Sequence, residues 1–122
     1  MGAAGQKLDA TFAALADPTR RGVVELLRRE PRRAGDLASR LGMSPPAMSR
    51  HLRVLRKTGL VEEEGTEDDA RVRVYRLRPE PFEQLRGWLD EVEAFWSDQL
   101  ASFKAHAERT RGGGTSRKGK RP

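Results

Sequence analysis

Apolar residues recur at helical spacing in five stretches of the chain, separated by glycine, proline or polar residues. Between the fourth and fifth stretches lie two short strand-like runs, joined by the Gly- and acid-rich segment 65–70, which predicts a β-hairpin. The pattern therefore predicts a mainly α fold with one hairpin. The expected helices span residues 7–16, 18–30, 34–41, 45–58 and 81–108, and the expected strands span residues 60–64 and 71–77.

Residues that favour helix ends stand at the boundaries of these stretches. Asp17 is a good N-cap, and Pro18 after it has no N–H to leave unpaired. Ser44 has the same capping role before the fourth helix. Gly42 and Gly59 follow the third and fourth helices, where a left-handed residue commonly ends a helix. The third and fourth helices thus form a helix-turn-helix, and the hairpin that follows makes it a winged helix-turn-helix.

The fourth predicted helix has one apolar side and one cationic side. Met48, Leu52 and Leu55 recur at the spacing of a buried helix face. The opposite side suits the DNA major groove, because an arginine there bonds O6 and N7 of guanine together. An ordinary solvated basic helix is the alternative. The cationic side consists of Ser49, Arg50, Arg53 and Lys57, with Arg56 beside them.

Positive charge is concentrated in the middle of the chain. The 122 residues carry a net charge of +6, but residues 18–58 alone hold eleven Lys and Arg against three Asp and Glu. Such a block is typical of a protein that binds nucleic acid, although solvated surface charge gives the same composition. Residues 109–122 add six basic residues and no acidic one, and this Gly-rich segment is expected to be a disordered tail.

The composition also excludes several classes of protein. Without cysteine the chain has no disulfide, thiolate metal site or cysteine nucleophile, and it has only two histidines. It contains no nucleophile motif and no phosphate-binding glycine loop, so neither an enzyme nor a cofactor is expected. No apolar run is long enough to span a membrane and no signal-peptide pattern is found, so a cytoplasmic protein is expected.

The last predicted helix carries more large apolar residues than a monomer of this size easily buries. They recur at steps of three and four, the spacing of a helix that packs against another helix. A homodimer is therefore expected, although packing within the monomer is the alternative for Leu85 and Leu89. The predicted interface residues on this helix are Leu89, Val92, Phe95, Trp96, Leu100 and Phe103.

Two motifs resemble one family of bacterial regulators. They are FAALADPTRR at residues 12–21 and MSPPAMSRHLRVLRKTGLV at residues 43–61. Both are similar to ArsR-type winged helix-turn-helix transcriptional repressors, and the resemblance spans residues 7–108. It implies an obligate homodimer through the first and last helices, a fourth helix in the major groove, and repression of the protein's own operon until an effector binds. On the first helix, the predicted interface residues are Leu8, Phe12 and Leu15.

Departures from the family pattern argue against a mechanism that depends on a metal ion. Metal-sensing members carry a Cys-x-Cys-type site near the third helix, or Asp and His ligands on the last helix. This chain has no cysteine, and His106 is the single histidine among the carboxylates of the last helix, so the chain resembles a non-metal-sensing branch.

Two positions of the helix-turn-helix also depart from the family pattern. Pro45 stands where many relatives have a glutamine, which removes one adenine-reading amide. Arg33 stands where a capping serine is expected, which weakens the start of the third helix by about 1 kcal/mol.

These observations predict a sequence-specific, autoregulatory repressor that binds an inverted-repeat operator as a homodimer, with half-sites about 34 Å apart. The alternative is a winged-helix interaction or dimerisation module without specific DNA binding. The predicted partners are double-stranded DNA, a second copy of the chain and, where release requires one, a small-molecule or protein effector. The predicted DNA-binding residues are Ser44, Pro46, Ser49, Arg50, His51, Arg53, Arg56, Lys57, Arg71 and Arg73.

Within that set, different roles are expected. Ser44, Ser49, Arg50 and Arg53 should read or position the bases, while Arg56, Lys57, Arg71 and Arg73 should mainly contact phosphates. His51 lies between the apolar and basic sides of its helix, which favours a structural or phosphate-adjacent role over a pH switch. The acidic tip of the hairpin is expected to face away from DNA or to be mobile. The predicted organisation is a flexible segment 1–6, a DNA-binding and dimerisation domain 7–108, and a basic tail 109–122.

Overall fold

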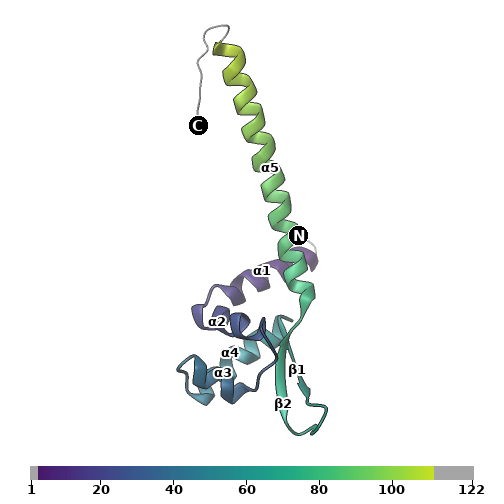
Figure 1. Ribbon diagram of the computed structural model, residues 1–122. Helices are drawn as coiled ribbons and strands as arrows, with labels where there is room; N and C mark the ends of the chain where they lie inside the picture. The colour runs from purple at the N-terminus through teal and green to yellow at the C-terminus, as the bar shows by residue number, and fades with distance from the viewer. Residues whose placement is uncertain (1–2, 112–122) are drawn as a thin grey trace. The chain divides into compact units, whose positions relative to one another are not determined.

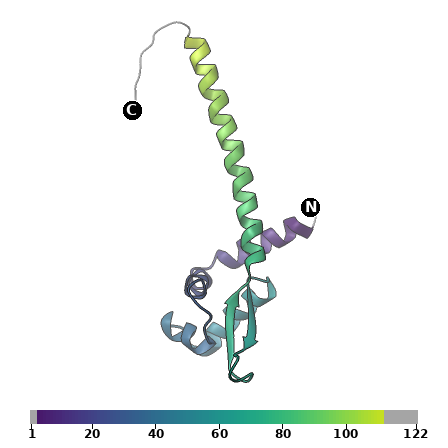
Figure 2. The ribbon, with the colours of Figure 1, turned by 45° about the vertical axis from the view of Figure 1, so that its right-hand side comes forward.

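The helices and strands follow the order that the sequence predicts (Figures 1 and 2). A computed structural model describes residues 3–111 of the chain. The chain divides into two compact units, one that ends at Leu85 and one that begins at Arg86. The elements are α1 (Ala3–Leu15), α2 (Pro18–Leu27), α3 (Ala34–Arg40), α4 (Pro45–Lys57), β1 (Val61–Gly65), β2 (Arg73–Leu77) and α5 (Pro79–Arg111).

Several of the predicted boundaries were wrong. α2 ends at Leu27 rather than at residue 30, and β2 begins at Arg73 rather than at residue 71. α1 begins at Ala3, so residues 3–6 are helical rather than flexible, because alanine has the lowest cost in a helix. α5 begins at Pro79, which fits the first turn of a helix, and it continues to Arg111. Residues 109–111 are therefore helical, and the rest of the predicted tail, 112–122, lies outside the described residues.

Side chains cap the first turns of α2 and α4 by hydrogen bonds, as predicted. Asp17 Oδ2 accepts a hydrogen bond from the backbone N–H of Arg20 at 3.0 Å. Ser44 Oγ accepts one from the backbone N–H of Ala47 at 3.3 Å. Each bond satisfies a donor that the first turn of a helix leaves unpaired. Arg33 before α3 makes no such bond, which confirms that this helix begins without a side-chain cap.

Glycine ends both helices of the helix-turn-helix. Gly42 has a φ of 64° and Gly59 a φ of 81°, the left-handed region that favours glycine. After Gly59, the N–H of Leu60 donates to the carbonyl of Leu55 at 2.9 Å, which closes a Schellman motif. The side chains of Leu55 and Leu60 are both fully buried, so this turn also fixes where the hairpin leaves the core.

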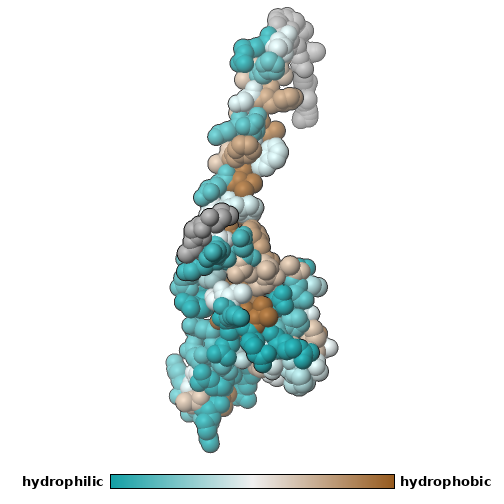
Figure 3. All heavy atoms as spheres, turned by 180° about the vertical axis from the view of Figure 1, so that it is seen from behind, coloured by the Kyte–Doolittle hydropathy of each residue, from teal (hydrophilic) through white to brown (hydrophobic). Residues whose placement is uncertain are grey.

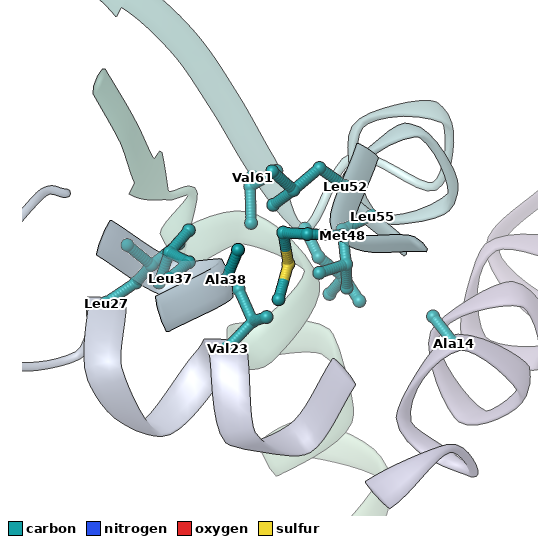
Figure 4. Packing of buried hydrophobic residues seen from close by; sticks show 10 residues of the cluster. Ala14, Val23, Leu27, Leu37, Ala38, Met48, Leu52, Leu55 and Val61 are labelled. Carbon is teal, nitrogen blue, oxygen red and sulfur yellow. The ribbon is translucent and has the colours of Figure 1, made fainter. Parts of the chain in front are cut away.

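The hydrophobic core of the first unit is built mainly from α2, α3, α4 and the start of β1. Figure 4 shows Met48 of α4 extending toward Val23 of α2 and Ala38 of α3. The predicted buried side of α4 is confirmed, and α1 contributes Ala14. The core residues are Ala14, Val23, Leu27, Leu37, Ala38, Met48, Leu52, Leu55, Leu60 and Val61.

The hairpin is antiparallel, with Val61 opposite Leu77 and Glu63 opposite Tyr75. Tyr75 packs against the core. A further contact was not predicted. The backbones of Arg32 and Tyr75 exchange two hydrogen bonds, of 3.1 Å and 2.7 Å, so the segment before α3 pairs with β2 at one position.

The second unit consists, in its described part, of α5 from Arg86 onward. Large apolar side chains recur along it and are exposed, and Figure 3 shows some of them as brown patches among hydrophilic neighbours. Leu89 is 51% exposed, Trp96 58% and Phe103 72%. Phe95 and Trp96 pack edge to face with ring centroids 6.1 Å apart. Among the described residues, no helix combines the length and apolarity needed to cross a membrane.

Candidate nucleic-acid interface

α4 exposes the cationic side that the sequence predicted. Because Met48, Leu52 and Leu55 are buried, the opposite side of the helix faces solvent. Four side chains on this exposed side have no hydrogen bond or ion pair with other residues in the described part of the chain. The hydrogen-bonding groups of these side chains are therefore available to a partner. The four side chains are those of Ser49, Arg50, Arg53 and Lys57.

The other predicted phosphate contacts are paired within the protein. Arg56 Nη1 lies 3.2 Å from Glu63 Oε1, and Arg73 Nε lies 3.9 Å from Glu63 Oε2. Arg71 Nε lies 3.2 Å from Asp69 Oδ1. The side chain of Glu63 is only 20% exposed, so it holds two guanidinium groups from a sheltered position on β1. The carboxylates of the wing thus neutralise arginines that the sequence assigned to DNA.

Tyr75 lies beside this cluster. Burial raises the pKa of Tyr75 above its ordinary value, and the negative charge of Glu63 raises it further. The phenol therefore stays neutral throughout the physiological pH range. Its place opposite Glu63 in the hairpin register puts the cluster where α4 and the hairpin meet.

His51 points toward the start of α2. Its Nδ1 lies 3.8 Å from Asp17 Oδ2 and 3.4 Å from Arg20 Nη1, and its side chain is 19% exposed. The pKa of Asp17 lies below its ordinary value, chiefly because the backbone N–H of Arg20 donates to the carboxylate. These contacts join α4 to the cap of α2, and they favour the structural interpretation of His51.

Some of the basic block serves the fold, which the charge pattern did not reveal. Arg20 Nε donates to the carbonyl of Ala14 at 2.7 Å, and Arg21 Nη1 donates to that of Leu15 at 2.8 Å. These bonds satisfy carbonyls that the end of α1 leaves unpaired, where a cation is also favoured. Two arginines that follow the last residue of α1 by five and six positions are the signal in the sequence that could have indicated this role.

Arg32 is a second structural arginine, with a side chain only 9% exposed. Its Nε donates to the carbonyl of Leu26 at 3.2 Å, and its Nη1 donates to Asp36 Oδ2 at 3.0 Å. The hydrogen bonds from Arg32 and then Arg40 hold the pKa of Asp36 below its ordinary value. Arg32 therefore ties the end of α2 to α3.

The tip of the wing is closed by its own hydrogen bonds. Thr66 Oγ1 donates to the carbonyl of Asp69 at 2.9 Å and accepts from its N–H at 3.1 Å. The N–H of Thr66 also donates to the carbonyl of Val72 at 3.0 Å. A side chain at Gly65 would place its Cβ 2.7 Å from the carbonyl oxygen of Ala70, so this position requires glycine.

The comparisons with known proteins agree with this geometry. The model of the family described as "Bacterial regulatory protein, arsR family" matches residues 17–63, which hold α2 to α4 and the start of β1. The transcriptional regulator Rv2034 of Mycobacterium tuberculosis is 41% identical over 97 residues, which cover 78% of this chain and 83% of the relative. The chain belongs to the ArsR family. It is therefore a DNA-binding transcriptional regulator and not an enzyme.

Two further proteins are similar to this chain. The ArsR-like transcriptional regulator from Rhodococcus sp. RHA1 has a TM-score of 0.73 and 34% identity, and the match covers 85% of this chain and 93% of that structure. The transcriptional repressor SdpR of Bacillus subtilis is 36% identical over 52 residues, which cover 43% of this chain and 58% of the relative. The winged helix-turn-helix fold predicted from the sequence is thereby confirmed.

Other predicted residues of this ArsR-family chain lie on α1 and α5. Leu8, Leu15 and Val92 are half-buried, and Phe12 is 40% exposed. Leu89, Phe95, Trp96, Leu100 and Phe103 are exposed. Within residues 3–111, no three His, Asp or Glu side chains are grouped so that they would hold a metal ion.

Proposed function

We propose that the chain is a repressor that reads a specific operator with the exposed side of α4. The observation that carries this proposal is that Arg50, Arg53 and Lys57 are exposed and without partners in the described chain, beside a buried face that fixes the helix. An arginine that is held by a rigid helix and free of intramolecular pairs can bond a guanine edge in two places. The chain also belongs to a family of transcriptional regulators, which supports the same assignment.

The residues of α4 have distinct roles in this proposal. Ser49, Arg50 and Arg53 contact base edges, and each bidentate arginine contributes about 1–3 kcal/mol of discrimination against the wrong base. Lys57, at the end of the helix, contacts phosphate. Pro46 and the hydroxyl of Ser44 lie at the entry of the helix and position it on the DNA. His51 stays with Asp17 and supports the helix from the protein side.

The arginines of the wing act differently. Arg56 and Arg73 share Glu63, and Arg71 is paired with Asp69, so each reaches phosphate only by leaving or sharing its carboxylate. Like-charge repulsion between these carboxylates and the DNA backbone opposes close approach of the wing. The wing therefore contributes less to affinity than its number of arginines suggests.

The repressor acts as a homodimer through α1 and α5. The exposed apolar side chains of α5 recur at steps of three and four, and a second copy of the same helix is a partner with matching spacing. Two-fold symmetry then requires an inverted-repeat operator, with half-sites about 34 Å apart. We place this regulator in the cytoplasm, where bacterial DNA lies. Release from DNA requires either a small-molecule effector other than a metal ion or a protein partner.

The test is fluorescence anisotropy with the DNA upstream of the protein's own gene and with an unrelated duplex of equal length. Both titrations contain about 150 mM salt and a metal chelator, because affinities for DNA depend strongly on salt. Binding to the upstream DNA at least about a hundredfold tighter than to the unrelated duplex is expected. Equal affinity for the two duplexes would contradict autoregulation. No binding even at low salt would favour the interaction-module alternative.

A further inference from the structure

A cavity of about 460 Å³ lies between α1, the end of α4 and the first turns of α5. All of its lining residues belong to the unit that ends at Leu85. The volume is in the range of small-molecule sites in proteins, about 300–1,000 Å³. The DNA-binding surface described above uses one of the lining residues, Lys57, and none of the others.

The charged residues of the cavity are mainly cationic. Lys7 comes from α1, Lys57 from α4, and Arg78 from the residue before α5. Only one of the three has an ion pair in the described chain, between Arg78 Nε and Glu80 Oε1 at 3.5 Å. The cavity therefore carries two more positive than negative charges. Walls of low dielectric constant concentrate such a field and favour an anion inside.

The rest of the lining is small or uncharged. Ala10 and Pro81 supply apolar surface, and Gly59 has open space where a side chain would stand. The hydroxyl of Thr11 is already donated to the carbonyl of Lys7 at 3.1 Å. A bare inorganic ion would leave these walls in contact with water. A carboxylate attached to a small apolar body uses both parts of the lining.

The cavity lies away from the surface of α1 that we assign to the dimer. Lys7, Ala10 and Thr11 line the cavity, whereas Leu8 and Phe12 belong to the proposed interface. At 3.6 residues per turn, these two faces of α1 are about a third of a turn apart. A second copy on the apolar face therefore leaves this side of the helix uncovered.

We propose that this cavity binds a small organic carboxylate, which lies between Lys7, Lys57 and Arg78 and weakens DNA binding. The effect on DNA rests on the proposed function, because Lys57 is there a phosphate contact. A carboxylate in the cavity pairs with Lys57 and places a negative charge beside the DNA backbone. Ligand and DNA then compete for one ammonium group, so each lowers the affinity of the other.

The binding test is an NMR titration of the full chain with 1-naphthoate and with hexanoate, and with the neutral amides of both as controls. The backbone amide signals of Thr11, Thr58 and Gly59 are followed. Saturable shifts are expected with the carboxylates, and binding about tenfold weaker with the amides. Lys7→Gln should weaken carboxylate binding about fivefold, whereas Lys104→Gln, on α5, should leave it unchanged.

Two results would overturn the proposed site. One is equal shifts with carboxylate and amide, which indicate apolar surface binding. The other is equal affinities for Lys7→Gln and Lys104→Gln. The coupling is tested by anisotropy with operator DNA, where a carboxylate should lower the affinity of the wild-type chain, and about fivefold more carboxylate should be needed for the same effect on Lys7→Gln. If the chain binds DNA and the carboxylates shift no cavity amide, the cavity proposal alone fails; if it binds no DNA, the NMR titration still decides the site.

Discussion

Arginine has three distinct uses in this chain, and they are separated only by what each side chain contacts. Arg50 and Arg53 are exposed on α4 without partners in the described residues. Arg20 caps the end of α1, and Arg32 joins α2 to α3. Arg56 is neutralised by Glu63. Net charge alone therefore overstates the charge that this protein offers to DNA.

Asp17 is a residue whose contribution to stability depends on pH. Its pKa in the folded chain lies below the ordinary 3.8, mainly through the hydrogen bond from the N–H of Arg20. The ionised carboxylate thus stabilises the fold fully above pH 3.8, and this contribution is lost as the pH falls through the lowered folded value. Asp17→Asn keeps a capping oxygen but does not titrate.

Urea unfolding between pH 7 and pH 3 tests this prediction. The wild-type chain should be more stable than Asp17→Asn near neutral pH, and the difference in unfolding free energy should shrink toward pH 3. A difference that stays constant across this range would show that the charge of Asp17 does not stabilise α2.

At the scale of the elements, local signals along the chain predict the helix caps, whereas contacts between residues far apart in the sequence were not predicted. The N-caps Asp17 and Ser44 and the helix-ending Gly42 and Gly59 act on their own turns, so their residue types alone predict the structure. The pairing of Arg32 with Tyr75 joins positions 43 residues apart. Such a contact depends on how α2, α3 and the hairpin pack, which periodicity does not encode.

The candidate site, too, was predicted only in part. The exposed side of α4 follows from the apolar spacing of Met48, Leu52 and Leu55, because a buried face defines its opposite. The pairing of Arg56 and Arg73 with Glu63 does not follow from spacing. It depends on the angle at which the hairpin leaves α4, which is set by the turn at Gly59 between the buried Leu55 and Leu60.

The wing cluster gives a prediction for Glu63. Glu63→Gln keeps the shape of the side chain and releases the charges of Arg56 and Arg73, which then attract phosphates. Affinity for operator and unrelated DNA should rise together, and the dependence of log affinity on log salt should steepen by about 1–2. The matched control is Glu62→Gln, the exposed neighbour on β1. Salt titrations of anisotropy measure both variants, and weaker DNA binding by Glu63→Gln would show that the ion pairs instead hold the arginines in place for DNA.

At the scale of the whole molecule, a second copy of the chain is expected to cover the apolar face of α5. Trp96 is 58% exposed in the single chain, in a row with Leu89 and Phe103. Trp96→Ala should therefore give monomers or aggregates, and Asp98→Ala, on the opposite side of the same helix, should remain dimeric. Sedimentation velocity distinguishes these states. A well-folded dimer of Trp96→Ala would refute the assigned interface.

If the exposed side of α4 reads the DNA sequence, Arg50→Ala and Arg53→Ala should differ from Lys57→Ala in their binding to DNA. Anisotropy gives the ratio of operator affinity to affinity for an unrelated duplex. Each arginine variant should lose about 1–3 kcal/mol of this discrimination. Lys57→Ala should instead weaken both duplexes alike and flatten the salt dependence by about 1. Unchanged operator affinity in both arginine variants would contradict the placement of α4 in the major groove.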